Sequence, residues 1–104
     1  MKEITVKDLE RKLDKQEDFQ LIDVREEFEY EVSNLNGENI PLGGLLFEVH
    51  KIATDKPVII HCRSGARSAA AVMQLEAQGF TKLYNLKGGI LAWAQEIDPN
   101  IPVY

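Results

Sequence analysis

The chain has 104 residues, of which 44% are hydrophobic and 28% are charged, and its 17 acidic and 12 basic residues give a formal net charge of −5. These values predict one globular domain over residues 1–104, and they disfavour binding to nucleic acid or to an anionic membrane, because both carry negative charge. No segment approaches the roughly 20 apolar residues that cross a bilayer, and the charged N-terminus lacks the apolar core of a signal peptide. We therefore expect a cytoplasmic protein.

The first part of the chain predicts two helices with one buried strand between them. Thr5 and Asp8 form a capping-box pattern, and apolar residues at helical spacing then predict a helix of about ten residues. Residues 19–24 are an apolar run broken by one acid, as expected of a strand buried on both faces. Acidic residues then open a short helix over residues 25–31, and we expect the run Glu26–Glu31 to form a solvated helix face.

The second part predicts strands in alternation with helices. In chain order, the patterns indicate a helix over residues 45–52, a strand over 58–61, a helix from 66 to a stop at Gly79, a strand over 82–86 and a helix over 90–95. This alternation predicts an α/β fold with a mainly parallel sheet that helices cover on both faces. Ligands of such sheets bind beyond the carboxyl ends of the strands, which is where the one cysteine, Cys62, falls.

The residues around Cys62 favour a reactive thiolate. The strand ends at Cys62, Gly65 permits a tight curve, and a helix begins near Ala66, so successive N–H groups can turn toward the sulfur. These dipoles and the charges of Arg63 and Arg67 predict that the pKa of the thiol lies below that of a free cysteine. A cysteine that only fills the core is the alternative, but such a cysteine is not ordinarily followed by Arg, Ser and Gly.

The spacing in this loop bears on whether it binds phosphate or sulfur. Four residues separate Cys62 from Arg67, whereas a tyrosine-phosphatase loop has five and then Ser or Thr. The shorter ring fits the outer sulfur of a persulfide better than a phosphate with its oxygens. No Asp lies in an obvious position to protonate a leaving alcohol. Sulfur is favoured, and a Cys-dependent phosphatase or arsenate reductase is the alternative.

Three segments, Leu21–Tyr30, Lys56–Ser68 and Gly79–Trp93, resemble in order and spacing the signatures of the rhodanese domain. The sequence resembles a single-domain rhodanese over nearly its whole length, which implies a three-layer α/β fold. The segment Val32–Leu45 departs from many members. It is similar to the rhodanese modules fused to adenylating enzymes of molybdopterin and thiamine sulfur chemistry.

The resemblance implies a sulfurtransferase without metal or organic cofactor. Its catalytic Cys62 would take a sulfane sulfur from thiosulfate, a polysulfide or a protein persulfide, carry it as a persulfide, and pass it to cyanide or a thiol, such as that of a sulfur-carrier or thioredoxin-like protein. A six-residue loop goes with sulfur transfer in this family, and a seven-residue loop goes with phosphate or arsenate chemistry. A non-catalytic module that binds a partner is the remaining alternative. The residues expected to bind substrate are Arg63, Ser64, Gly65, Ala66 and Arg67.

Several other residues have structural interpretations. Asp23 and Arg25 end a strand, and the resemblance places the pair near the site. A salt bridge that braces the loop is an interpretation at least as good, and we predict neither residue to be catalytic. By strand alternation, His61 points away from the site as a core histidine. Trp93 is expected in the core. The turn at Gly88–Gly89 also follows a strand end, so it can approach the cysteine loop.

Overall fold

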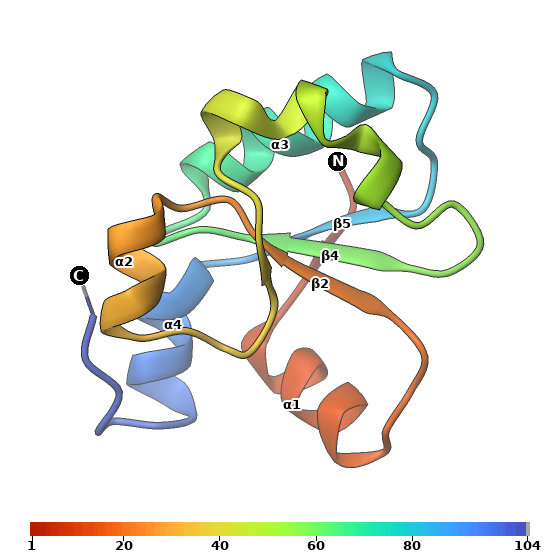
Figure 1. Cartoon of the computed structure of the whole chain (residues 1–104). Coiled ribbons are helices and arrows are strands. Elements are labelled where there is room, and N and C mark those ends of the chain that lie inside the picture. The colour runs from red at the N-terminus through yellow and green to blue at the C-terminus, as the bar shows by residue number, and fades with distance from the viewer. Residues whose placement is uncertain (104) are drawn as a thin grey trace.

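A computed structural model describes residues 1–103 of the chain and contains a sheet of five parallel strands with helices on both faces (Figure 1). The strand order is β1-β5-β4-β2-β3, so β4 lies in the centre between β5 and β2. This architecture confirms the predicted α/β class. The strands are β1 (Glu3–Ile4), β2 (Gln20–Asp23), β3 (Glu38–Asn39), β4 (Val58–His61) and β5 (Leu83–Leu86).

Within residues 1–103, three α-helices and two 3₁₀-helices connect the strands, and a fourth α-helix follows the last strand. They are α1 (Val6–Asp14), α2 (Glu27–Val32), η1 (Leu42–Phe47), η2 (Val49–Lys51), α3 (Ala66–Ala77) and α4 (Gly89–Glu96). Helix α3 and the two 3₁₀-helices lie on one face of the sheet, and α1 and α4 lie on the other (Figure 1). Both bonds of the predicted capping box are present at Thr5, and Gly79 has the expected left-handed conformation (φ +97°) after α3.

The helix predicted over residues 45–52 is wrong in type, because this segment forms η1 and η2. Its hydrogen bonds span three residues, from the N–H of Glu48 to the carbonyl of Leu45 and from the N–H of Ile52 to the carbonyl of Val49 (both 3.0 Å). Two glycines disfavour an α-helix at the start of this segment, and short 3₁₀ turns satisfy the backbone without one.

Two edge strands were not predicted. Each has two residues, β1 beside β5 and β3 beside β2. A strand of two residues is too short to show an alternation of apolar and polar side chains in the sequence. It is therefore recognised only by its pairing with a longer neighbouring strand.

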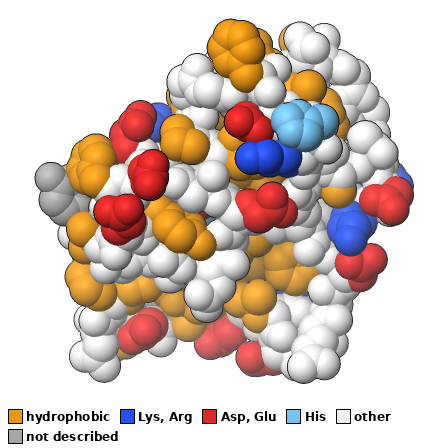
Figure 2. Space-filling model, viewed as in Figure 1, with side chains coloured by type: hydrophobic (Ala, Val, Ile, Leu, Met, Phe, Trp, Pro, Cys, Tyr) orange, Lys and Arg blue, Asp and Glu red, His pale blue; other side chains and the backbone are white. Residues whose placement is uncertain are grey.

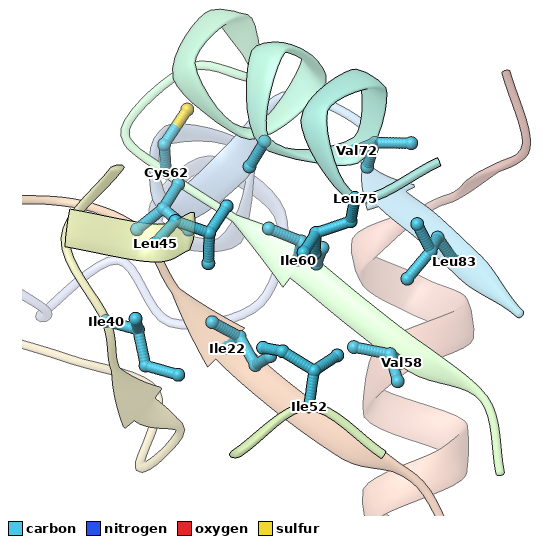
Figure 3. Close-up of a cluster of buried hydrophobic side chains, with 12 residues drawn as sticks. Ile22, Ile40, Leu45, Ile52, Val58, Ile60, Cys62, Val72, Leu75 and Leu83 are labelled. Atoms are coloured by element: carbon cyan, nitrogen blue, oxygen red, sulfur yellow. The ribbon is translucent and has the colours of Figure 1, made fainter. Parts of the chain in front are cut away.

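Alternate residues of the central strands point into two separate hydrophobic clusters. Ile22 and Ile60 belong to the cluster on the α3 side of the sheet, in which Ile60 lies beside Leu75 and Ile22 lies beside Ile52 (Figure 3). Leu21 and Ile59 point to the opposite face, into the cluster that α1 and α4 cover. Trp93 packs against this second cluster and is partly buried, which agrees with its predicted place in the core.

The turn at Gly88–Gly89 contacts the cysteine loop, an approach that the sequence allowed but did not decide. The N–H of Ile90 donates to the carbonyl of Cys62 and the N–H of Leu91 donates to the carbonyl of Arg63, both at 3.0 Å. A Cβ atom at Gly89 would lie 2.5 Å from each of these two carbonyl oxygens. Only glycine permits this close backbone contact, which fixes the cysteine loop to the end of β5.

Charged side chains of both signs are interspersed on the face that Figure 2 shows, and the Lys and Arg side chains there lie beside acidic ones. Within residues 1–103, no helix has the length and apolar composition needed to span a membrane.

We expect Gly89→Ala to destabilise the protein more than Gly79→Ala. Both glycines have positive φ (+58° and +97°), so backbone strain is common to both substitutions, but a Cβ at Gly79 meets nothing within 4 Å. The steric clash at Gly89 should therefore lower the free energy of unfolding by about 1–3 kcal/mol more than the control substitution does. Urea denaturation of both variants measures this difference, and equal losses would contradict the proposed contact.

Candidate active site

Cys62 lies directly beyond β4, with its sulfur directed toward the N-terminal end of α3 (Figure 3). The residue is 1% exposed. The N–H of Gly65 donates to the sulfur atom Sγ at 3.1 Å, and the Ser68 hydroxyl lies 3.4 Å from it. Gly65 has a φ of +114°, a conformation that side-chain-bearing residues rarely adopt, so glycine makes the tight curve possible.

The environment of Cys62 favours the thiolate. Burial raises the pKa of the thiol, but hydrogen bonds from the Ser68 hydroxyl and from the N–H groups of Ser68, Gly65 and Ser64 outweigh burial and hold the pKa below its ordinary value. The predicted direction is therefore confirmed. The leading causes differ in part from the prediction, because one hydroxyl and several backbone N–H groups lower this pKa most. The charge of Arg67 also interacts with Cys62, and this interaction helps to raise the pKa of Arg67.

Ser68 and Asn85 form a buried pair beside the sulfur that the sequence analysis missed. The Ser68 hydroxyl lies 2.5 Å from Oδ1 of Asn85 and 3.2 Å from the carbonyl oxygen of Gly65. Nδ2 of Asn85 donates to the same Gly65 carbonyl at 3.3 Å. Because the hydroxyl has one proton and three acceptors in reach, it can donate to Sγ when the sulfur is charged and to Asn85 when it is not.

A signal for Ser68 was present in the sequence, because it follows Arg67 as Ser or Thr follows the arginine of tyrosine-phosphatase loops. Asn85 gave no such signal. It lies on β5, and only the pairing of β5 with β4 brings it to the loop.

The two loop arginines differ in their surroundings. Arg67 donates to both carboxylate oxygens of Glu29 in α2, with Nη1–Oε1 at 2.6 Å and Nη2–Oε2 at 3.0 Å. The side chain of Arg63 is exposed and has no ion-pair partner within residues 1–103. Of the predicted substrate-binding residues, Ser64 and Gly65 present N–H groups to the sulfur, while the side chain of Ala66 is exposed at the start of α3.

The prediction that Glu26–Glu31 forms a solvated face is wrong at Glu29, which is 5% exposed. The hydrogen bond from Arg67 holds the pKa of Glu29 below its ordinary value and outweighs burial, which raises it. A buried acid is stable here because its charge is paired.

Asp23 and Arg25 form a fully buried salt bridge, with Nη2–Oδ2 at 2.7 Å, in agreement with the structural interpretation. Arg25 also donates to the carbonyl oxygens of Ser33, at 2.7 Å, and Glu29, at 3.4 Å. The pair therefore ties the end of β2 to α2. Since the Asp23 carboxylate accepts hydrogen bonds from Arg25, it braces the neighbouring helix and is not free for catalysis.

His61 is fully buried and faces Asp23 on the adjacent strand, with Nε2–Oδ2 at 3.6 Å. Its Nδ1 lies 3.3 Å from the carbonyl oxygen of Cys62. Burial lowers the pKa of His61, although the Asp23 carboxylate raises it, so the ring is neutral near pH 7. This placement confirms the prediction of a core histidine.

In the part of the chain that the structure describes, no group of three or more His, Cys, Asp or Glu side chains could hold a metal ion. The chemistry available at Cys62 is that of a buried thiol at the end of a strand, surrounded by hydrogen-bond donors that favour its thiolate form.

The sequence model of the rhodanese-like domain family matches residues 5–96. The chain belongs to the rhodanese-like domain family. A solved structure of a rhodanese-like domain protein from Staphylococcus aureus has a TM-score of 0.85 to this chain and is 30% identical, with coverage of 100% of this chain and 99% of that one. The rhodanese-like fold predicted from the three signatures is therefore confirmed.

Several curated relatives carry descriptive names. A protein named sulfurtransferase from Allochromatium vinosum is 36% identical over 94 residues, which cover 89% of this chain and 88% of that protein. The uncharacterized protein YqhL of Bacillus subtilis is 46% identical over 79 residues, which cover 75% of this chain and 63% of YqhL. The probable adenylyltransferase/sulfurtransferase MoeZ of Mycobacterium tuberculosis is 31% identical over 104 residues, 97% of this chain but only 26% of MoeZ.

These relatives place the chain among rhodanese-like domains that include sulfurtransferases. The similarity to MoeZ agrees with the predicted likeness to modules of adenylating enzymes. Because the chain spans less than two thirds of YqhL and about a quarter of MoeZ, these relatives extend beyond the shared domain.

We expect Ser68→Ala to raise the pKa of Cys62, because the substitution removes a hydroxyl that donates to the charged sulfur. The ultraviolet absorbance of the thiolate, measured as a function of pH, should shift to higher pH. Ser64→Ala is a matched control, since it removes the same hydroxyl from an exposed residue and keeps the backbone N–H. Superimposable titration curves for wild type and Ser68→Ala would show that the hydroxyl does not bind the thiolate.

Proposed function

We propose that this protein is a sulfurtransferase that carries a sulfane sulfur on Cys62 as a persulfide. The observation that carries the proposal is the buried sulfur of Cys62, which faces N–H groups from its own loop and the hydroxyl of Ser68, so that its thiolate form is favoured. Membership of the rhodanese-like domain family, with relatives named sulfurtransferase, supports the same chemistry.

The reaction has two balanced steps. In the first, Sγ of Cys62 attacks the outer sulfur of the donor, a new S–S bond forms, and the donor's own bond to that sulfur breaks. When the donor is thiosulfate, this step releases sulfite. When the donor is a thiol persulfide, it releases a thiolate. In the second, cyanide or an acceptor thiolate attacks the outer sulfur and Cys62 departs again as a thiolate. The N–H groups around Sγ stabilise its charge at the start and at the end of the cycle.

Three features favour sulfur over phosphate as the transferred group. Cys62 is 1% exposed, so a single protruding sulfur atom can reach it more readily than a phosphorus atom surrounded by oxygens. The nearby carboxylates of Asp23 and Glu29 are each bound by an arginine, so neither is free to protonate a leaving alcohol. The spacing of four residues between Cys62 and Arg67 points the same way.

The acceptor in this proposal is a thiol, either small or on a protein such as a sulfur carrier or a thioredoxin-like protein. Relatives named adenylyltransferase and sulfurtransferase support a protein acceptor. The exposed Arg63 and Ser64 adjoin Cys62 and form the part of the loop that an acceptor meets first. A cytoplasmic location stays a prediction from the sequence.

Incubation with thiosulfate or inorganic polysulfide should add the mass of one sulfur atom to the protein. The added sulfur should disappear on treatment with cyanide, with release of thiocyanate, because a persulfide gives up its outer sulfur to this nucleophile. Intact-mass spectrometry measures both steps.

Cys62→Ser is the control for this experiment and should gain no sulfur, since it keeps the shape of the side chain but lacks the thiolate. A wild-type protein that remains unmodified by thiosulfate, polysulfide and organic persulfides would contradict the proposal. Hydrolysis of an aryl phosphate that depends on Cys62 would favour a phosphatase instead.

A further inference from the structure

The guanidinium of Arg67 forms an ion pair with the carboxylate of Glu29. The two side chains form a bidentate pair that joins α2 to the first turn of α3. The side chain of Glu29 is only 7% exposed, whereas that of Arg67 is 36% exposed. Two parallel hydrogen bonds to a buried carboxylate make this a stronger and more directional pair than a surface ion pair.

The carboxylate of Glu29 is held in place by its own helix. Its Oε1 accepts a hydrogen bond from the N–H of Glu26 at 3.1 Å, which forms part of the cap of α2. Arg25 donates to the carbonyl of Glu29, and Arg25 is itself fixed by Asp23. Glu29 therefore cannot follow Arg67 toward the sulfur, and the guanidinium stays balanced by a fixed negative charge.

This pairing leaves little free positive charge at the site. Asp23 balances Arg25, Glu29 balances Arg67, and within residues 1–103 the loop cation without an ion-pair partner is the exposed Arg63. An incoming donor thus meets the sulfur of Cys62 with its ring of N–H groups, the exposed Arg63, and a charge on Arg67 that interacts with Cys62 but is balanced by Glu29. Because Coulomb energy scales with the product of the charges, this environment penalises the thiosulfate dianion, whereas a protonated persulfide group, R–S–SH, brings no charge to the sulfur.

We propose that Glu29 is a specificity-determining residue, which withholds the charge of Arg67 so that the site favours organic persulfides over the thiosulfate dianion. The inference rests on the proposed sulfur transfer and names its donor class. In the favoured step, Sγ of Cys62 attacks the outer sulfur of R–S–SH, the S–S bond of the donor breaks, and R–S⁻ leaves. The proton stays on the transferred sulfur, and no other reactant is needed.

Glu29→Gln tests the proposal, because it removes the negative charge with little change of shape and frees the charge of Arg67. The measurement is the second-order rate constant for sulfur loading of Cys62, by rapid quench and intact-mass spectrometry, with thiosulfate and with freshly generated cysteine persulfide. We expect the ratio of the thiosulfate rate to the persulfide rate to rise about fivefold, and to fall back with added salt.

Glu27→Gln is the matched control, because it removes the same charge from an exposed position on the same helix. Its ratio should stay within about twofold of the wild-type ratio, since a solvated charge is screened. An equal rise in Glu27→Gln and Glu29→Gln would overturn the proposal, because the effect would then reflect net charge alone.

The double variant Glu29→Gln, Arg67→Gln keeps the pair neutral and should return the ratio to the wild-type value. If circular dichroism shows that Glu29→Gln is unfolded, the rate ratio of the double variant is measured in its place. If the double variant loaded more slowly from thiosulfate than the wild type but equally fast from persulfide, the proposal would be overturned. Such a result would mean that Arg67 binds the thiosulfate anion in the wild type.

The outcomes separate this inference from the proposed function. Loading of wild type from either donor, with an unchanged ratio in Glu29→Gln or an equal fall of both rates, would overturn the role of Glu29 and leave sulfur transfer standing. Failure of the wild type to load from either donor would overturn sulfur transfer itself.

Discussion

A negative charge on the sulfur of Cys62, a residue that is 1% exposed, needs hydrogen bonds in place of water. The N–H groups of Ser64, Gly65 and Ser68 and the Ser68 hydroxyl supply them, and together they outweigh the effect of burial on the pKa of Cys62. These donors converge because β4 ends just before Cys62, the chain turns through the left-handed conformation of Gly65, and α3 starts immediately afterwards. The loop sequence is therefore constrained by the need to direct several donors at one atom.

The neighbours of β4 support this loop from both sides. On the β5 side, Asn85 holds the Gly65 carbonyl, and the backbone after Gly89 binds the carbonyls of Cys62 and Arg63. On the β2 side, the salt bridge between Asp23 and Arg25 anchors α2, and α2 in turn presents Glu29 to Arg67. The central position of β4 in the sheet makes this two-sided support possible.

Features that depend on residues close together in the sequence could be predicted, and features that depend on strand order could not. The capping box at Thr5, the stop at Gly79 and the strand, loop and helix around Cys62 are each local, and each is present. By contrast, Glu29 binds Arg67 across 38 positions and Ser68 binds Asn85 across 17. Glu29 also lies among acids that are exposed, so composition alone marked it as one more surface charge.

Neutral dipoles suit a sulfur atom whose charge must change during the proposed cycle. In the persulfide, Sγ is bonded to the outer sulfur and no longer carries the negative charge, so the donors around Sγ lose their charged acceptor. The Ser68 proton then has Oδ1 of Asn85 within 2.5 Å as an alternative acceptor, and no buried hydroxyl is left without a partner. An arginine paired directly with Sγ would lack this freedom, because its charge would remain buried after the sulfur became neutral. The ion pair between Arg67 and Glu29 therefore suits the persulfide form of Cys62 as well as the proposed choice of donor.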